Sequence, residues 1–222
     1  MIDLHTHSFL SDGELSPAEL LQRAKEKGYK ALGITDHADP SNIDWVIPRI
    51  VKFCQEVSRV DKGIKVIPGV ELTHCPPALI GELARRARKR GAKLILVHGQ
   101  TIVEPVPEGT NRAALEADID ILAHPGLISE EEVKLAKQRG IFLEISSRKG
   151  HCLSNGHVAR LALEHGAKLV LNTDTHSPDD LINIDEARKI LQGAGLSAEK
   201  IEEVLDNSRK LIKKIENERK TS

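Results

Sequence analysis

The sequence predicts an α/β fold built on a parallel sheet and formed by one domain. Short β-branched runs alternate with longer segments of helical periodicity from one end of the chain to the other. The length of 222 residues suits one domain with a single core, and no Pro/Gly-rich linker divides the chain. Alternation of strands and helices is typical of parallel sheets with helical crossovers. Spacing alone leaves open whether the sheet closes into a barrel or forms an open, doubly wound sheet.

Seven short runs rich in Val, Ile, Leu and Ala are the candidate strands, and each precedes a segment with helical periodicity. They are residues 2–4, 31–35, 65–70, 93–97, 119–123, 141–145 and 168–171.

The predicted helices begin at recognisable capping sequences. Ser16 is followed by a proline and, three residues on, by Glu19, which is a capping box with proline at the first helical position. Ser129 precedes three glutamates, and residues 177–180 have a similar pattern. The last segment, about residues 197–219, places its apolar residues on one stripe, so we expect an amphipathic helix that packs on the body of the protein.

Composition and charge narrow the class of protein. The 32 basic and 33 acidic residues argue against a protein that coats nucleic acid or binds membranes through a polybasic surface. No secretory signal or membrane-spanning run is visible. The three cysteines are widely separated, which predicts reduced thiols in a cytoplasmic protein. The sequence does not indicate an oligomeric state.

Potential metal ligands follow six of the seven predicted strands. In parallel β/α folds the carboxyl ends of the strands share one face, and that face carries the active site. We therefore expect six histidines and three carboxylates to converge there: His5, His7, His37, His98, His124 and His176, with Asp12, Glu71 and Asp174.

Convergence of these residue types indicates a metal centre. Imidazole and carboxylate suit zinc, manganese or iron. Nine ligands are too many for one ion, and with a bridging carboxylate they suit two or three divalent ions. The nine residues are therefore difficult to explain as unrelated histidines and carboxylates that each have a separate structural role.

The order of these motifs is the second functional indication. The motifs are His5-Thr6-His7, Ser11-Asp12-Gly13, Thr35-Asp36-His37, Gly69-Val70-Glu71, His98, Ala123-His124-Pro125 and Asp174-Thr175-His176. Along residues 1 to about 180 this order resembles the polymerase and histidinol phosphatase (PHP) family. The resemblance implies a distorted seven-stranded β/α barrel, similar to a TIM barrel, with a trinuclear metal site.

The resemblance also implies how the ligands are shared among three metal positions. By position in the motifs, the sets are His5, His7, Glu71 and Asp174 for the first; Glu71, His98 and His124 for the second; and Asp12, His37 and His176 for the third. Glu71 is the expected bridge. Asp12 stands where some members have histidine, which gives the third position a harder oxygen ligand.

Residues after the sixth predicted strand are candidates for substrate binding. Arg148 lies on the same rim and is suited to a bidentate contact with phosphate, and Lys149 and His151 share its loop. We expect Glu71, Asp174, His176 and Arg148 to carry catalysis. The predicted activity is hydrolysis of the phosphate ester of a small metabolite by hydroxide held between the metal ions. The family resemblance makes histidinol phosphate one candidate substrate.

Three other functions are weighed against this one. A phosphodiesterase or exonuclease of the same family would need a nucleic-acid groove, for which no basic excess is visible. An amidohydrolase-type enzyme commonly uses a modified lysine at a strand end, but Lys65, Lys93 and Lys168 fall at strand starts. A non-catalytic scaffold would have no need for a complete ligand set.

Overall fold

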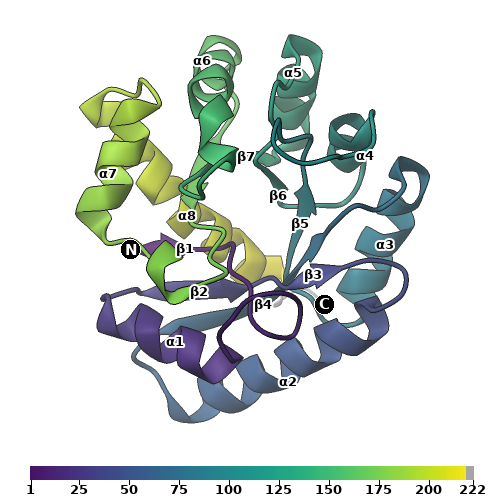
Figure 1. The fold of residues 1–222 in the computed structure, drawn as a ribbon, viewed down its shortest axis with the longest axis vertical. Helices are drawn as coiled ribbons and strands as arrows, with labels where there is room; N and C mark the ends of the chain where they lie inside the picture. The colour runs from purple at the N-terminus through teal and green to yellow at the C-terminus, as the bar shows by residue number, and fades with distance from the viewer. Residues whose placement is uncertain (219–222) are drawn as a thin grey trace.

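Parallel strands form the centre of the fold in a computed structural model that describes residues 1–218 (Figure 1). Their order in the sheet is β1-β2-β4-β5-β6-β7-β8, and each neighbouring pair is parallel. A short strand, β3, also pairs with β4 beyond the end of β2. The strands are β1 (Ile2–Asp3), β2 (Ala31–Ile34), β3 (His37–Ala38), β4 (Lys65–Leu72), β5 (Leu94–His98), β6 (Ile121–Ala123), β7 (Phe142–Ser146) and β8 (Leu169–Asn172).

The segments that follow β1 and β8 bring the two ends of the sheet together. The backbone N–H of His7 donates to the carbonyl of Thr175 at 2.8 Å, and the N–H of Asp174 donates to the carbonyl of His5 at 2.9 Å. These bonds form a short seam beyond the regular strands. The predicted seven-stranded barrel is thus confirmed, and it is nearly closed.

Helices surround the outer face of this barrel (Figure 1). They pack on the outward-facing strand residues in two apolar clusters. The larger includes Val97 and Ile145, and the smaller lies between the first two helices and β2. The helices are α1 (Pro17–Glu26), α2 (Ile43–Val60), α3 (Pro77–Lys89), α4 (Thr110–Glu116), α5 (Glu130–Arg139), α6 (Asn155–His165) and α7 (Ile184–Gly193), with short 3₁₀ helices η1 (His151–Ser154) and η2 (Pro178–Asp180).

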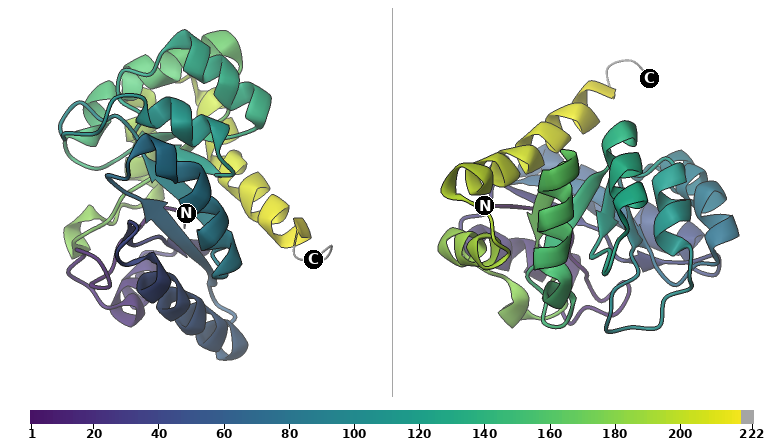
Figure 2. Two further views of the ribbon diagram at one scale, coloured as in Figure 1. Left: turned by 90° about the vertical axis from the view of Figure 1, so that its right-hand side faces the viewer. Right: turned by 90° about the horizontal axis from the view of Figure 1, so that it is seen from above.

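The last helix, α8 (Ala198–Glu218), lies across one end of the barrel (Figure 2). Its buried residues Leu211, Ile212 and Ile215 pack with inward-facing strand residues such as Leu94 and Phe142. These strand residues lie at the starts of their strands, so α8 covers the amino-terminal end and leaves the opposite end for the site. The amphipathic helix predicted at about residues 197–219 is therefore present, and residue 219 lies outside the described residues.

Two of the three predicted helix caps begin an α-helix. The Ser16 side chain accepts from the N–H of Glu19 at 3.1 Å, and Ser129 forms a full capping box with Glu132. The third sequence, residues 177–180, forms only the turn η2. Helix α7 begins later because the side chain of Asn183 accepts hydrogen bonds from two N–H groups of its first turn.

Within residues 1–218 no helix combines the length and the apolar character that crossing a bilayer requires.

Candidate metal centre

The predicted ligands lie together at the carboxyl ends of the strands. They surround or lie beneath a cavity of about 420 Å³, and Arg148 lies at its edge. The structure brings all nine into the same region. Groups of side chains that could hold a metal ion among the described residues include His5, His7 and Glu71; His7, Asp12, His37 and His176; and His98, His124 and His151. Asp174 joins them through its contacts with His7 and His124.

Strand alternation directs several of these side chains inward. In β5, Leu94 and Leu96 belong to the barrel interior, so His98, two residues further, faces the same side. In β4, Ile67 lies in the interior, and Glu71 follows with the same parity. Apolar residues thus fill the lower barrel, and polar residues occupy the last inward position of the same strands.

Two potential ligands have unusual backbone conformations. His124 has φ of 25° and Asp174 has φ of 55°, values that non-glycine residues rarely adopt. His124 directly follows the inward-facing Ala123, so regular alternation would turn its side chain outward. The strained backbone instead directs the imidazole toward Glu71. Strain of this kind is concentrated at functional sites.

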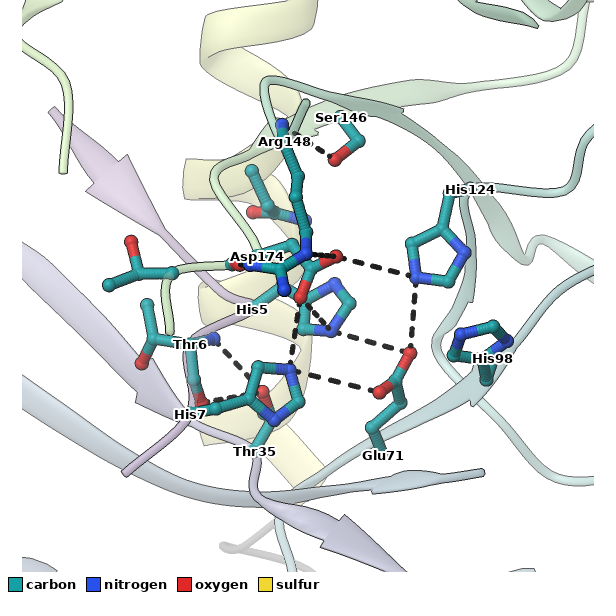
Figure 3. A network of polar contacts seen from close by, with 12 residues as sticks. His5, Thr6, His7, Thr35, Glu71, His98, His124, Ser146, Arg148 and Asp174 are labelled. Carbon is teal, nitrogen blue, oxygen red and sulfur yellow. Dashed lines mark hydrogen bonds and ion pairs between the residues drawn. The ribbon is translucent and has the colours of Figure 1, made fainter. Parts of the chain in front are cut away.

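Glu71 and Asp174 form the centre of the cluster (Figure 3). Both carboxylates are buried. Glu71 Oε1 lies 3.4 Å from Nε2 of both His5 and His124, while Asp174 Oδ1 lies 3.2 Å from Nε2 of His7. Each carboxylate therefore contacts imidazoles from different strands, which is the arrangement that a bridging ligand requires.

A second group of ligands lies nearer the opening. Nε2 of His37 and Nε2 of His176 are 3.3 Å apart. Asp12 Oδ1 is 3.4 Å from the former nitrogen and 3.3 Å from the latter. His7 stacks on both imidazoles, with ring centroids 4.1 Å from each. His7, expected at the first metal position, is thus also adjacent to the third.

Hydrogen bonds on the outer side of the cluster orient several imidazoles. Nδ1 of His5 lies 2.8 Å from Glu144 Oε1, Nδ1 of His98 lies 3.1 Å from the carbonyl of Gly99, and Nδ1 of His176 lies 2.9 Å from that of Asp174. These oxygens accept a hydrogen bond from the N–H at Nδ1, so in a neutral ring the lone pair is on Nε2. Such outer partners are characteristic of metal-binding histidines.

The donor set fits divalent metal ions. Six buried side-chain atoms at the cluster have no hydrogen-bond partner: Nε2 of His5, Nδ1 and Nε2 of His7, Oε1 of Glu71, Nδ1 of His124 and Oδ1 of Asp174. Buried polar atoms normally have partners, and lone pairs of neighbouring neutral imidazoles and carboxylates repel one another. Divalent cations between them would satisfy these atoms, because imidazole and carboxylate suit zinc, manganese and iron.

Electrostatics at the site favours the charged forms of Glu71 and Asp12, whereas burial raises the pKa of Asp174. Burial opposes the charge on Glu71, but His5 and His37 outweigh it and hold its pKa well below the usual value. Burial also opposes ionisation of Asp12, yet a hydrogen bond from His176 and the charge of His37 lower the pKa to about 2. For His5 burial acts to lower the pKa, whereas Glu144 and Glu71 raise it well above its ordinary value. Metal ions would compete with the protons bound to imidazoles such as His5, so metal binding would release these protons.

The loop that carries Asp12 is held by Asp36. Its carboxylate accepts hydrogen bonds from the N–H and hydroxyl groups of both Ser8 and Ser11, at 2.8–3.1 Å. Asp36 is buried, and its carboxylate contacts this loop. It therefore positions the segment between His7 and Asp12 from outside the cluster.

The three predicted substrate contacts differ in location. Arg148 is half-buried; its Nη1 donates to the carbonyl of Asp174 at 3.2 Å, and its Nε lies 3.7 Å from Asp174 Oδ2 (Figure 3). Lys149 is exposed and is not among the residues that line the cavity in the described part of the chain. His151 is buried and stacks on His124, with ring centroids 4.1 Å apart. Burial, followed by the charge of His124, lowers its pKa to about 3, which keeps the ring neutral.

Two acidic residues at the site were not identified from the sequence. Glu144 accepts from His5, from the N–H of His124 and from the side chain of Asn172. The sequence does mark Glu144 as the one acidic residue of an apolar strand. It lies two residues after Phe142, so its side chain points to the same inward side. Glu104 reaches the cluster from the loop between β5 and α4, and its Oε2 lies 3.0 Å from Nε2 of His98. No periodic pattern marks that loop.

A nearly closed parallel barrel with this ligand cluster at the carboxyl ends of its strands defines a metal-dependent hydrolase. The chain matches the PHP domain family over residues 3–214 and belongs to that family.

Two relatives cover nearly the whole chain. An uncharacterized protein of Methanocaldococcus jannaschii is 47% identical over 215 residues, which is 96% of this chain and 99% of the relative. A protein of Shewanella loihica named as a probable phosphatase is 28% identical and covers 96% of this chain, with 91% of its own length matched.

Two solved structures have the same fold. A chain in the structure of an archaeal ribonuclease P with mature tRNA superimposes with a TM-score of 0.73 at 17% identity, covering 98% of this chain and 92% of that one. The histidinol phosphate phosphatase of Lactococcus lactis, complexed with zinc, L-histidinol and phosphate, has a TM-score of 0.61 at 17% identity, covering 88% and 94%.

Proposed function

We propose that this protein is a metal-dependent phosphomonoesterase that hydrolyses the phosphate ester of a small metabolite. The observation that carries the proposal is the convergence of nine potential metal ligands at one cavity, with Arg148 at its edge. The family and the relative named as a probable phosphatase support it. Histidinol phosphate is a candidate substrate because of the fold shared with the Lactococcus lactis enzyme.

The proposed ligand sets follow the three metal positions implied by the family motifs. His5, His7 and Asp174 belong to the first, His98 and His124 to the second, and Glu71 bridges the two. The third consists of Asp12, His37 and His176. When bound, two or three zinc, manganese or iron ions supply water activated for attack on phosphorus and positive charge that neutralises the phosphoryl oxygens.

The protein's own residues would bind and orient the phosphate ester. Arg148 is placed to bind phosphoryl oxygens through its guanidinium group, because it enters the cavity directly beside Asp174. Arginine suits this role through its fork of parallel N–H donors. The contact would strengthen as negative charge gathers on those oxygens, so it would contribute to the rate as well as to binding. Lys149 and His151 remain proposed contacts of the substrate from the same segment.

The size and charge of the cavity favour a small monoester over a nucleic acid. Arg148 is the one arginine or lysine among the residues that line the cavity in the described chain. Nucleic-acid grooves instead carry several basic residues along the path of the strand. An amidohydrolase mechanism with a strand-end lysine also lacks support, since Lys65 lies at the start of β4 and pairs with Glu216 of α8.

The function can be tested with purified protein loaded separately with zinc, manganese or iron. Its hydrolysis of a panel of phosphomonoesters, phosphodiesters and amides would be compared before and after chelation. We expect release of inorganic phosphate from monoesters, abolished by the chelator and restored by metal. Preferential cleavage of the diesters or amides would contradict the proposal.

A further inference from the structure

Two side chains outside the proposed ligand sets contact the second metal position. They are His151, from η1, and Glu104, from the loop between β5 and α4. Both lie beside His98, and the following inference rests on the proposed function because it concerns the same cluster.

His151 is buried beside two of the proposed metal ligands, His98 and His124. Its side chain is 3% exposed. His98, His124 and His151 can each offer one ligand atom such that these atoms lie within 4.8 Å of one another. The parallel stacking of His124 and His151 places the two rings side by side, with an interplanar angle of 15°. A histidine that only contacted substrate would present more of its ring to the cavity.

The orientation of His151 matches that of the other imidazoles. Its Nδ1 lies 2.7 Å from the hydroxyl oxygen of Thr101, which is buried and can accept the Nδ1 proton. Nε2 is then directed inward, 3.4 Å from Glu104 Oε1 and 3.7 Å from Asp174 Oδ2. An outer acceptor on one nitrogen and a carboxylate near the other is the pattern expected of a metal-bound imidazole.

Glu104 approaches the second metal position from the side that faces solvent. Nδ1 of His98 donates to the carbonyl of Gly99, so a neutral His98 directs its Nε2 lone pair at Glu104 Oε2, 3.0 Å away. A carboxylate oxygen and an imidazole lone pair repel each other unless a cation lies between them.

Two glycines allow the loop with Glu104 to approach the cluster. A Cβ atom on Gly99 would lie 2.4 Å from the carbonyl oxygen of Ala123, and one on Gly126 would lie 1.9 Å from that of Gln100. Gly126 also has φ of 64°, which favours glycine. The loop after β5 therefore lies directly against the segment after β6, and this contact brings Thr101 and Glu104 to the site.

We propose that His151 and Glu104 are ligands of the second metal position, in addition to His98, His124 and Glu71. The position then has three imidazoles and two carboxylates, a donor set that suits zinc, manganese or iron. Four of its side chains are buried, whereas Glu104 is 38% exposed and closes the side of the position that faces the cavity.

Metal binding can be measured directly in the variants His151→Gln and Glu104→Gln. Metal-free protein would be titrated with Zn²⁺ against a competing chelator, and the visible spectrum of Co²⁺-loaded protein would report changes in coordination. We expect one Zn²⁺ per chain to bind about 10–100-fold more weakly in each variant, with an altered Co²⁺ spectrum. Controls are His157→Gln, whose imidazole contacts the carbonyl of Ile128, and Glu108→Gln in the same exposed loop.

The outcomes distinguish this proposal from the proposed function. Wild-type affinity, stoichiometry and Co²⁺ spectrum in a variant would exclude that residue from the coordination of the metal. If His151→Gln does not fold, Glu104→Gln still decides the proposal for the exposed ligand, and His151→Asn measured by the same titration decides it for the buried one. A wild-type protein that bound metal without hydrolysing phosphate esters would contradict only the proposed function.

Discussion

At the scale of single residues, the site combines a buried anionic centre with imidazoles held from outside. Glu71 and Asp174 contact histidines from several strands, whereas Glu144 and Asp36 bind the segments that carry the ligands. The difference is functional: the first pair has buried oxygens without hydrogen-bond partners, and the oxygens of the second pair accept hydrogen bonds. Unsatisfied carboxylates in a barrel interior are costly, so they indicate an ion binding site.

The proposed bridging role of Glu71 leads to the first prediction. Glu71→Gln removes the negative charge and nearly keeps the shape, so we expect loss of bound metal and at least about 100-fold loss of hydrolysis. Elemental analysis and phosphate release would measure the two effects, with the exposed Glu131→Gln as control. Full metal content with near-normal turnover would show that Glu71 is not a ligand.

Arg148 allows phosphate recognition to be separated from metal binding. Arg148→Ala should retain the metals and the fold but lower kcat/KM by roughly 10²–10³, the scale of one preorganised donor. Arg148→Lys should recover part of the loss, since it keeps the charge without the planar fork. Arg160→Ala, at an exposed residue of α6 that pairs with Glu164, is the control. Unchanged kcat/KM in Arg148→Ala would assign phosphate binding to the metals or to neighbouring residues.

At the scale of elements, the sequence predicted the strands and their functional ends better than the connections. The β-branched runs and the residues that follow them sufficed because parallel strands present their carboxyl ends on one face. Strand β3 is two residues long and too short for a period to be visible. The position of Glu104 could not be predicted, because it depends on the close contact between two loops at Gly99 and Gly126. His151 was placed at the rim by its loop, and its burial depends on contacts with Thr101 and His124, which come from other loops.

Helix α8 leads to a prediction about stability. Leu211 is buried against the interior residues at the amino-terminal end of the barrel, so Leu211→Ala would leave a cavity there. We expect the free energy of unfolding to fall by about 2–5 kcal/mol, measured by urea denaturation of the metal-free protein. Lys213→Ala, at an exposed position of the same helix, should change it by less than about 0.5 kcal/mol. Equal effects of the two substitutions would mean that α8 does not cover the barrel end.

At the scale of the whole molecule, the proposed metal ligands connect strands from both ends of the chain. Metal ions that bind only the native state stabilise it by about 2.7 kcal/mol at a hundredfold excess over Kd. For a protein of this size we therefore expect Tm to rise by roughly 5–10 °C on metal loading. Calorimetry with and without a chelator would measure the shift, and Mg²⁺, which prefers oxygen ligands, is the control ion. A Tm independent of zinc, manganese and iron would contradict the cluster.

The narrow seam between the two ends of the sheet has a consequence for the assembly of the protein. Potential ligands on one side of the seam are at residues 5 and 7, and those on the other side are at residues 174 and 176. An ion held by both sides is a cross-link that closes a loop of almost the entire chain. Closing a loop of about 100 residues removes about 4.7 kcal/mol of chain entropy from the unfolded state, by the estimate used for disulfides. Because the two halves of this cross-link are far apart in sequence, a growing chain could complete the proposed first metal position only after β8 has been synthesised and has joined β1.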